Sequence, residues 1–167
     1  MSYRLNADEV FEMAEQMERN AVRFYSRAAE LTAGAETKRI LLDLAAMEEE
    51  HERVFASLRA SLIKPGEREV QVFDPEGQNK DYLLAWADRS VFKVDEDPLA
   101  ALSGDYSPEA LFTAAIGKEK DSIVFYEGIT PYLADKQDVA RVHTIIQEEI
   151  GHIALLAKLR RDLAPAP

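Results

Sequence analysis

One chemical pattern occurs twice in this chain and constrains its fold more than any other feature. A glutamate is followed thirty residues later by a Glu-x-x-His pair, and the whole pattern recurs 101 residues further on. Its six members are Glu18, Glu48, His51, Glu119, Glu149 and His152. A pair of metal ions in a four-helix bundle needs one carboxylate from each of two helices and a Glu-x-x-His from each of two others. The sequence therefore predicts an all-α four-helix bundle with a di-metal site in its core.

The repeat extends well beyond the six polar residues. The same shift of 101 residues pairs further identical residues, among them Phe11 with Phe112, Ala14 with Ala115, Phe24 with Phe125, Tyr25 with Tyr126, and Leu58 with Leu159. Two copies of one helical hairpin explain this repeat best. Because 167 residues suit one domain with one core, we expect a single domain 1–167. It would consist of a hairpin 7–63, a crossover 64–106 and a hairpin 107–163.

Turn and cap residues agree with the two hairpins. If Glu18 and Glu48 lie level on antiparallel helices, the turn falls near residue 33. Gly34 stands there and tolerates a left-handed conformation at the helix end. Ser107, which is followed by proline, predicts the start of the third helix. Pro131 predicts a kink or an early end of that helix, because proline removes a backbone donor.

The crossover 64–106 has no counterpart in the repeat. It must travel the length of the bundle, since the second and third helices have to run parallel if the hairpins are to present equivalent faces. Residues 81–88 predict a short helix within it. Trp86, Val91 and Phe92 give it apolar surface, which packs either on the bundle or on a second subunit.

Helical geometry directs the repeated pattern toward one point. Residues three apart on an α-helix lie on one face, so Glu48 and His51 project together, as do Glu149 and His152. We expect Glu48 and Glu149 to bridge two metal ions, with one histidine and one terminal glutamate completing each ion. Two divalent cations would balance the four buried carboxylates. Such mixed ligands suit two iron ions, with manganese or zinc as alternatives.

Tyr25 and Tyr126 each follow a terminal glutamate by seven residues, so they line the same core. Two interpretations stay open for them. Each is either a packed core tyrosine whose hydroxyl bonds to a backbone carbonyl, or a phenol that donates to a ligand carboxylate across the bundle. In the second case the tyrosines would tune the site and could supply an electron.

Other polar residues near the pattern are expected to lie outside the ligand set. His143 precedes His152 by nine residues, about half a turn around the helix, so it should face away. The acids beside the ligands point elsewhere, although a hydrogen bond between an imidazole and one of them is left open. They are Glu49, Glu50 and Glu148.

Composition excludes several classes of partner. The 31 acidic and 20 basic residues give a net charge of −11, so nucleic acid and anionic membrane surfaces should be repelled. No export signal and no long apolar stretch stand out, so we expect a cytoplasmic protein that spans no membrane. The chain has no cysteine and therefore no thiolate zinc or iron–sulfur centre. Electrons would have to come from an external donor.

Four strings of the helices resemble the ferritin-like superfamily, in particular its rubrerythrin and bacterioferritin branch. They are MERNAVRFY at 17–25, EEEH at 48–51, EKDSIVFY at 119–126 and EEIGH at 148–152. The resemblance implies a ferritin-like bundle with a di-iron centre that reacts with oxygen or hydrogen peroxide, with ferrous iron as reductant or substrate. It implies ferroxidase or peroxide-reductase activity in oxidative-stress defence. Rubrerythrins often carry a rubredoxin-like iron domain, and this chain, which has no cysteine, is expected to have none. A homodimer through the crossover or an outer helix face is expected.

Two other functions stay open. The protein could buffer iron or deliver it to a partner without catalysis. It could also be a scaffold in which zinc serves only to stabilise the fold.

Overall fold

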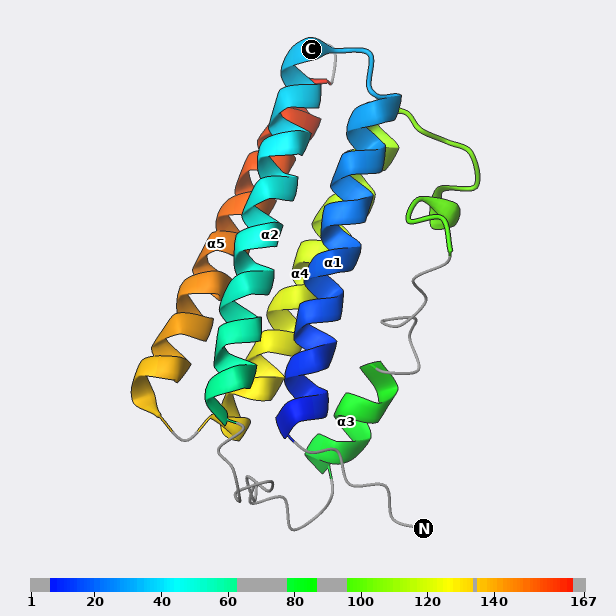
Figure 1. Ribbon diagram of the computed structural model, residues 1–167. Coiled ribbons are helices and arrows are strands. Elements are labelled where there is room, and N and C mark those ends of the chain that lie inside the picture. Colours follow the sequence, from blue (N-terminus) through cyan, green and yellow to red (C-terminus); the bar gives the residue numbers. More distant parts are fainter. Residues whose placement is uncertain (1–6, 63–77, 87–95, 134, 164–167) are drawn as a thin grey trace.

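Long α-helices make up most of the described chain, as the computed structural model in Figure 1 shows. The structure describes residues 7–62, 78–86, 96–133 and 135–163. Its α-helices are α1 (Ala7–Leu31), α2 (Ala35–Leu62), α3 (Gln78–Trp86), α4 (Pro108–Ile129) and α5 (Lys136–Asp162), with short 3-10 turns η2 (Ala100–Leu102) and η3 (Thr130–Tyr132). No strand occurs among these residues, which confirms the all-α prediction.

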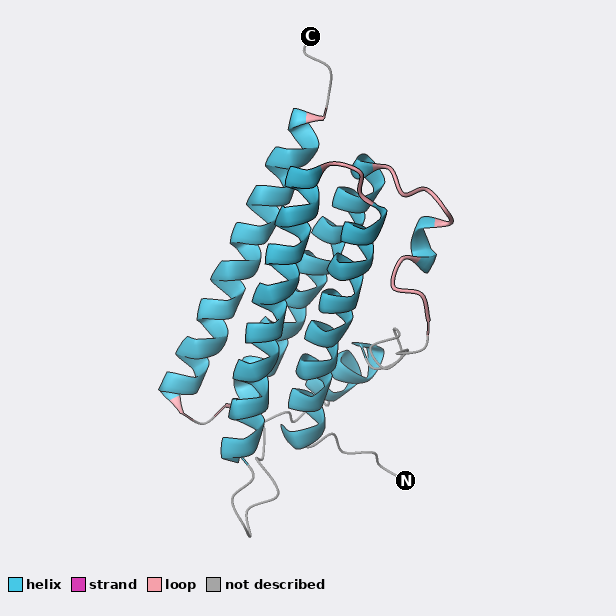
Figure 2. Ribbon diagram, turned by 45° about the horizontal axis from the view of Figure 1, so that its top comes forward, coloured by secondary structure: helices cyan, strands magenta, loops and turns pink. Residues whose placement is uncertain are grey.

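The four long helices form a bundle of two antiparallel hairpins (Figures 1 and 2). Helix α1 packs against α2 and α4, and α5 packs against α4 and α2. Helices α2 and α4 run in the same direction, so the chain between them returns along the length of the bundle, as predicted. None of the described helices is both long enough and apolar enough to cross a membrane.

Local sequence explains where the helices begin and end. The Ser107 hydroxyl accepts a hydrogen bond from the backbone N–H of Ala110, and proline occupies the first position of α4. The Asp135 side chain caps α5 in the same way by accepting from the N–H of Gln137. Helix α4 ends two residues before Pro131, which lies in η3, so the predicted early end is confirmed.

The turn of the first hairpin falls where the sequence predicted it, but its glycine acts differently. Gly34 lies between α1 and α2, and its carbonyl accepts the first helical hydrogen bond of α2, from the N–H of Lys38 at 2.8 Å. Its φ angle is not positive, so the expected left-handed conformation is wrong. Gly34 begins α2 as a cap residue, a position that glycine also favours.

Two apolar clusters fill the bundle, one on each side of the layer that holds Glu18. The first contains Val10, Phe11, Ala14, Phe55, Phe125, Tyr126, Val142 and Ile145. The second contains Leu111, Phe112, Ala115, Leu156, Phe24, Tyr25, Leu41 and Leu44. The shift of 101 residues converts the first set into the second, member by member. The repeat in the sequence is therefore a repeat of core packing, in which the hairpins exchange roles.

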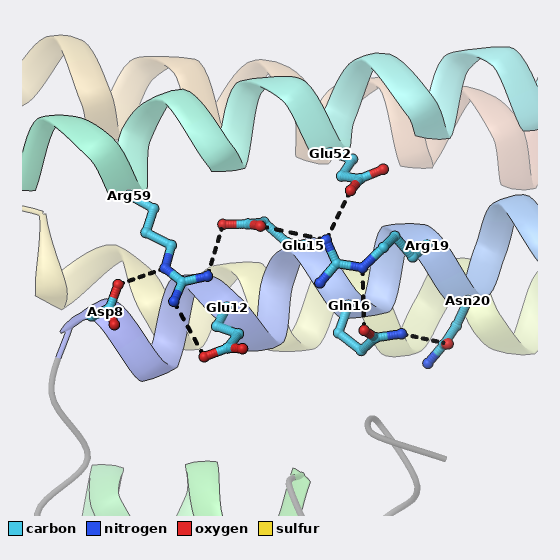
Figure 3. A network of polar contacts seen from close by, with 8 residues as sticks. All are labelled: Asp8, Glu12, Glu15, Gln16, Arg19, Asn20, Glu52 and Arg59. Atoms are coloured by element: carbon cyan, nitrogen blue, oxygen red, sulfur yellow. Dashed lines mark hydrogen bonds and ion pairs between the residues drawn. The ribbon is translucent and has the colours of Figure 1, made fainter. Parts of the chain in front are cut away.

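A ladder of ion pairs holds α2 against α1 (Figure 3). The guanidinium of Arg59 lies 2.5 Å from Asp8 and 3.4 Å from Glu15, and it also pairs with Glu12. Arg19 bridges Glu15 to Glu52 on the other helix. Because exposed ion pairs contribute little stability each, we assign this ladder mainly to the register between the two helices.

The same contact recurs in the second hairpin. Arg160 stands 101 residues after Arg59, and its guanidinium lies 3.8 Å from Glu109 and 3.3 Å from the hydroxyl of Thr113. Those two residues occupy the positions equivalent to Asp8 and Glu12. The repeat therefore extends to the surface that joins the two helices of each hairpin.

The short helix predicted at 81–88 is α3, and it packs on α4. The Tyr82 hydroxyl donates to the backbone carbonyl of Val124 at 2.5 Å, and the Trp86 and Phe125 rings meet edge to face with centroids 5.9 Å apart. Trp86 thus packs on the bundle, which was one of the two alternatives. Val91 and Phe92 lie outside the described residues.

Candidate di-metal site

The structure brings all six predicted ligands together in the middle of the bundle. Glu18 lies on α1, Glu48 and His51 on α2, Glu119 on α4, and Glu149 and His152 on α5. Each of these residues is at most 3% exposed, a degree of burial that charged residues rarely show unless they are paired or bind metal. The imidazole rings stack with centroids 5.8 Å apart.

One group of possible ligands surrounds His51. Its Nδ1 atom lies 3.0 Å from Glu48 Oε2, 3.1 Å from Glu149 Oε1 and 3.8 Å from Glu18 Oε1. These four side chains each offer one atom within 4.8 Å of the others and could hold a metal ion. They come from three helices, α1, α2 and α5.

A second group surrounds His152 in the same arrangement. Its Nδ1 atom lies 3.0 Å from Glu149 Oε2, 3.2 Å from Glu48 Oε1 and 3.7 Å from Glu119 Oε2. These four side chains also each offer one atom within 4.8 Å of the others and could hold a metal ion. Glu48 and Glu149 belong to both groups, each with one oxygen toward either histidine. That is the arrangement in which two carboxylates bridge two ions.

Each core tyrosine donates a hydrogen bond to the terminal glutamate of the other hairpin. The Tyr25 hydroxyl donates to Glu119, and the Tyr126 hydroxyl donates to Glu18 Oε1 at 2.5 Å. Burial, followed by the nearby carboxylate charges, raises the pKa of both phenols well above 10. Of the two interpretations, the hydrogen bonds match the second. A catalytic or electron-donating role for Tyr25 and Tyr126 stays a prediction.

Protonation would balance the site without a metal ion. Burial lowers the pKa of both imidazoles, but the carboxylates around them outweigh it and raise the pKa of His51 to about 11 and that of His152 to about 12. For Glu149, burial acts upward, but contacts with both histidines lower the pKa to about 2. The pKa of Glu48 is also lowered despite burial, by the same two imidazoles.

The pKa values of the two terminal glutamates, Glu18 and Glu119, shift upward, in the direction opposite to those of Glu48 and Glu149. Burial raises the pKa of Glu18 well above 4.5, and the charges of Glu48 and Glu149 add to the effect. Burial, with the same two carboxylates, raises the pKa of Glu119 to about 8. These shifts favour the neutral form of Glu18 and Glu119, while Glu48 and Glu149 favour the carboxylate form beside two imidazolium ions.

The donor set fits a pair of divalent cations. Glu48 Oε1 and Glu149 Oε1 are buried and have no hydrogen bond among the described residues, although each faces an imidazole. A cation between the carboxylates and the imidazole would satisfy both oxygens. Carboxylates and imidazoles together suit iron, manganese or zinc.

Two residues that sequence reasoning set aside lie outside both groups. His143 is exposed on α5, as predicted. Among the neighbouring acids, Glu148 contacts a candidate ligand: its Oε2 lies 2.9 Å from His51 Nε2, on the side of the ring away from the other carboxylates. This is the imidazole contact that the sequence left open.

The chain has a ferritin-like fold with a buried carboxylate–histidine cluster in its core. Residues 1–59 match the family model for rubrerythrin, which supports the resemblance found in the sequence over α1 and most of α2. That segment includes three of the six candidate ligands.

The fold is that of a crystal structure from Thermotoga maritima, described as a ferritin-like diiron-carboxylate protein. The two chains are 21% identical, with a TM-score of 0.68, and the alignment covers 98% of this chain and 100% of the other. At this identity the match establishes the fold alone. The comparison with curated proteins gave no match.

Proposed function

We propose that this protein is a di-iron carboxylate protein of rubrerythrin type, which binds two iron ions and reacts with oxygen or hydrogen peroxide. One observation carries the proposal: six buried side chains form two groups that share Glu48 and Glu149. The family match and the description of the Thermotoga protein support iron as the metal. The metal ligands would be the six residues predicted from the sequence.

When bound, two ferrous ions supply two electrons, which with two protons convert hydrogen peroxide to two molecules of water or dioxygen to hydrogen peroxide. The side chains would perform the remaining tasks. Glu48 and Glu149 would hold the ions as a pair, while Tyr25 and Tyr126 orient the terminal glutamates through hydrogen bonds. The apolar clusters on either side would limit entry of water.

The test is oxidation of iron bound to the full chain. The protein is loaded with two equivalents of ferrous iron without oxygen and mixed with oxygen or peroxide in a stopped-flow instrument. Ferric absorbance and oxidant consumption are then followed. Wild type should oxidise two ions per chain. Glu48→Ala or His152→Ala should lose most of the reaction, because each removes a buried ligand. His143→Ala, which removes an exposed histidine from the same helix as His152, should behave like wild type.

Other outcomes would identify the alternatives. Unchanged oxidation in both ligand variants would contradict the proposal. Tight, reversible binding of two ferrous ions with no oxidant consumed would indicate iron buffering or delivery. Zinc as the metal of protein purified from its native source would indicate a stabilised scaffold.

We further propose that the protein works as a homodimer in the cytoplasm and takes electrons from an external donor. Light scattering coupled to size-exclusion chromatography would determine the oligomeric state. Cell fractionation would determine the location.

A further inference from the structure

The two groups of candidate ligands differ in the hydrogen-bond partner of the histidine Nε2 atom, the ring nitrogen that faces away from the site. His51 Nε2 is 2.9 Å from Glu148 Oε2, while His51 Nδ1 faces the carboxylates of the site. With Nδ1 serving as the ligand, the Nε2–H donates to Glu148 across the interface between α2 and α5. The Glu148 side chain is 46% exposed, so it meets His51 from the surface of the bundle.

His152 has no equivalent contact. The shift of 101 residues that converts His51 into His152 converts Glu148 into Met47. Met47 is 40% exposed on α2, a similar exposure, but its thioether is only a weak acceptor. His152 Nε2 is buried and has no hydrogen-bond partner among the described residues.

The tyrosine contacts and the bridging glutamates of the two groups match. Tyr126 donates to Glu18 in one group and Tyr25 donates to Glu119 in the other. Both groups share the same two bridging glutamates. The two histidines themselves differ in the partner of the distal imidazole nitrogen, which is present for His51 and absent for His152 among the described residues.

This difference has a known physical effect on metal binding. A carboxylate that accepts from the distal N–H of a ligand imidazole fixes its tautomer and ring orientation and makes the ligating nitrogen more basic. Loss of such a partner typically lowers metal affinity about 10–100-fold. His152 lacks this help, and its buried N–H stays unsatisfied.

We infer that the two metal positions are unequal: the group of Glu18, Glu48, Glu149 and His51 binds its ion first and more tightly, with Glu148 as a positioning residue. The inference rests on the proposed function, since it assumes that the six residues bind two ions. It adds an order of filling and assigns that order to one contact.

The test is an anaerobic calorimetric titration of the full chain with Co²⁺. Because the two ions would share carboxylates, the second would bind more weakly than the first even at two identical positions. Two binding steps in the wild type are therefore not sufficient evidence, and the variants test the inference. Glu148→Ala should weaken the tighter step about 10–100-fold and leave the stoichiometry at two. The matched control is Glu49→Ala, which removes an equal charge beside a ligand from an exposed residue that pairs with Arg53. It should leave both steps unchanged.

The converse variant places the missing partner behind the other histidine. Met47→Glu should strengthen the weaker step, because it supplies a carboxylate at the position equivalent to Glu148. Residues 47 and 148 are both exposed, so both variants should fold. In the metal-free protein Glu148→Ala should lower the thermal unfolding midpoint, because the buried Nε2–H of His51 loses its acceptor.

Single-ligand variants identify which position fills first. His152→Ala should keep the tighter step, and His51→Ala should lose it. A Glu148→Ala titration identical to that of Glu49→Ala would overturn the inference while leaving two bound ions intact. Failure of the wild type to bind two ions would instead overturn the proposed function.

Discussion

At the scale of single residues, the candidate site is a cluster of charges that compensate one another. The Nδ1 atom of each imidazole has three carboxylates within 3.8 Å, and the two shared glutamates each face both imidazoles. Removing one member leaves a buried charge without its partner, which is costly in a protein interior. Substitutions that keep shape and remove only a hydrogen bond are therefore the more informative ones.

Tyr126→Phe is such a substitution. It removes the donor to Glu18, and that hydrogen bond acts to lower the pKa of Glu18 against the effect of burial. We expect a proton to compete better with metal for Glu18, so that Co²⁺ binds about tenfold more weakly in a calorimetric titration. The free energy of unfolding should fall by about 1–3 kcal/mol, because a buried oxygen loses its donor.

The control for this variant is Tyr106→Phe, in a residue that is 39% exposed. It should change neither metal affinity nor stability. If the two phenylalanine variants behave alike, the hydrogen bond from Tyr126 does not contribute to metal binding.

The convergence of the six candidate ligands could be predicted because their spacing is a property of the chain itself. Glu48 and His51 share a helix face wherever that helix packs, and the repeat supplies the second pair. The contact of Glu148 with His51 could only be left open. It depends on how closely α2 and α5 approach, and a position on one helix does not reveal what lies opposite on the other.

At the scale of elements, a glycine controls how the crossover helix α3 meets the bundle. A Cβ atom added at Gly128 would lie 2.4 Å from Cε1 of Tyr82. The absence of a side chain there lets the tyrosine ring lie on α4. Its hydroxyl then reaches the carbonyl of Val124.

Gly128→Ala should therefore displace α3. The Tyr82 hydrogen bond would break, and the free energy of unfolding should fall by about 1 kcal/mol. Trp86 is the one tryptophan of the chain, so its fluorescence should shift to longer wavelength as it leaves Phe125.

The matched control is Gly117→Ala on the same helix, where an added Cβ meets nothing within 4 Å. It should stabilise the protein by about 0.5–1 kcal/mol, because alanine favours a helix interior. A stabilising Gly128→Ala with unchanged fluorescence would contradict the described packing of α3.

Helix ends proved more predictable than helix packing. Ser107 acts through its own hydroxyl on the helix that follows it, and Pro131 acts through its own backbone, so their effects could be predicted from local sequence. Gly34 was placed correctly as a turn, but its conformation was not, because glycine suits both ends of a helix. The packing of the Tyr82 ring on Gly128 was not predicted, since a single glycine in a helix does not indicate which side chain packs against it.

At the scale of the whole molecule, the pKa shifts link folding to pH. The folded chain holds protons on His51, His152 and Glu119 that an unfolded chain would release, since their pKa values rise from 6.5 to about 11, from 6.5 to about 12 and from 4.5 to about 8. Stabilisation by the histidines is complete below pH 6.5 and is lost as pH rises through their folded values. The stabilisation contributed by protonated Glu119 is complete below pH 4.5 and is lost as the pH rises to its folded pKa of about 8.

The metal-free protein should consequently lose stability between pH 6.5 and pH 8. Metal binding has the opposite dependence, because each ion replaces protons on its ligands. The rise in unfolding midpoint produced by Co²⁺, measured by calorimetry, should therefore be larger at pH 8 than at pH 6.5. A midpoint for the metal-free protein that does not change over this range, with a constant gain from Co²⁺, would contradict the assigned protonation states.

Each ligand group takes three side chains from one hairpin and one from the other. Neither half of the polypeptide can complete a coordination sphere alone. A metal ion at either position would thus require that the two hairpins pack against each other. Removal of the metal by a chelator would weaken the contact between the hairpins before it affects the packing within either one. In a protein built this way, the packing of one hairpin against the other would depend on how much metal is available.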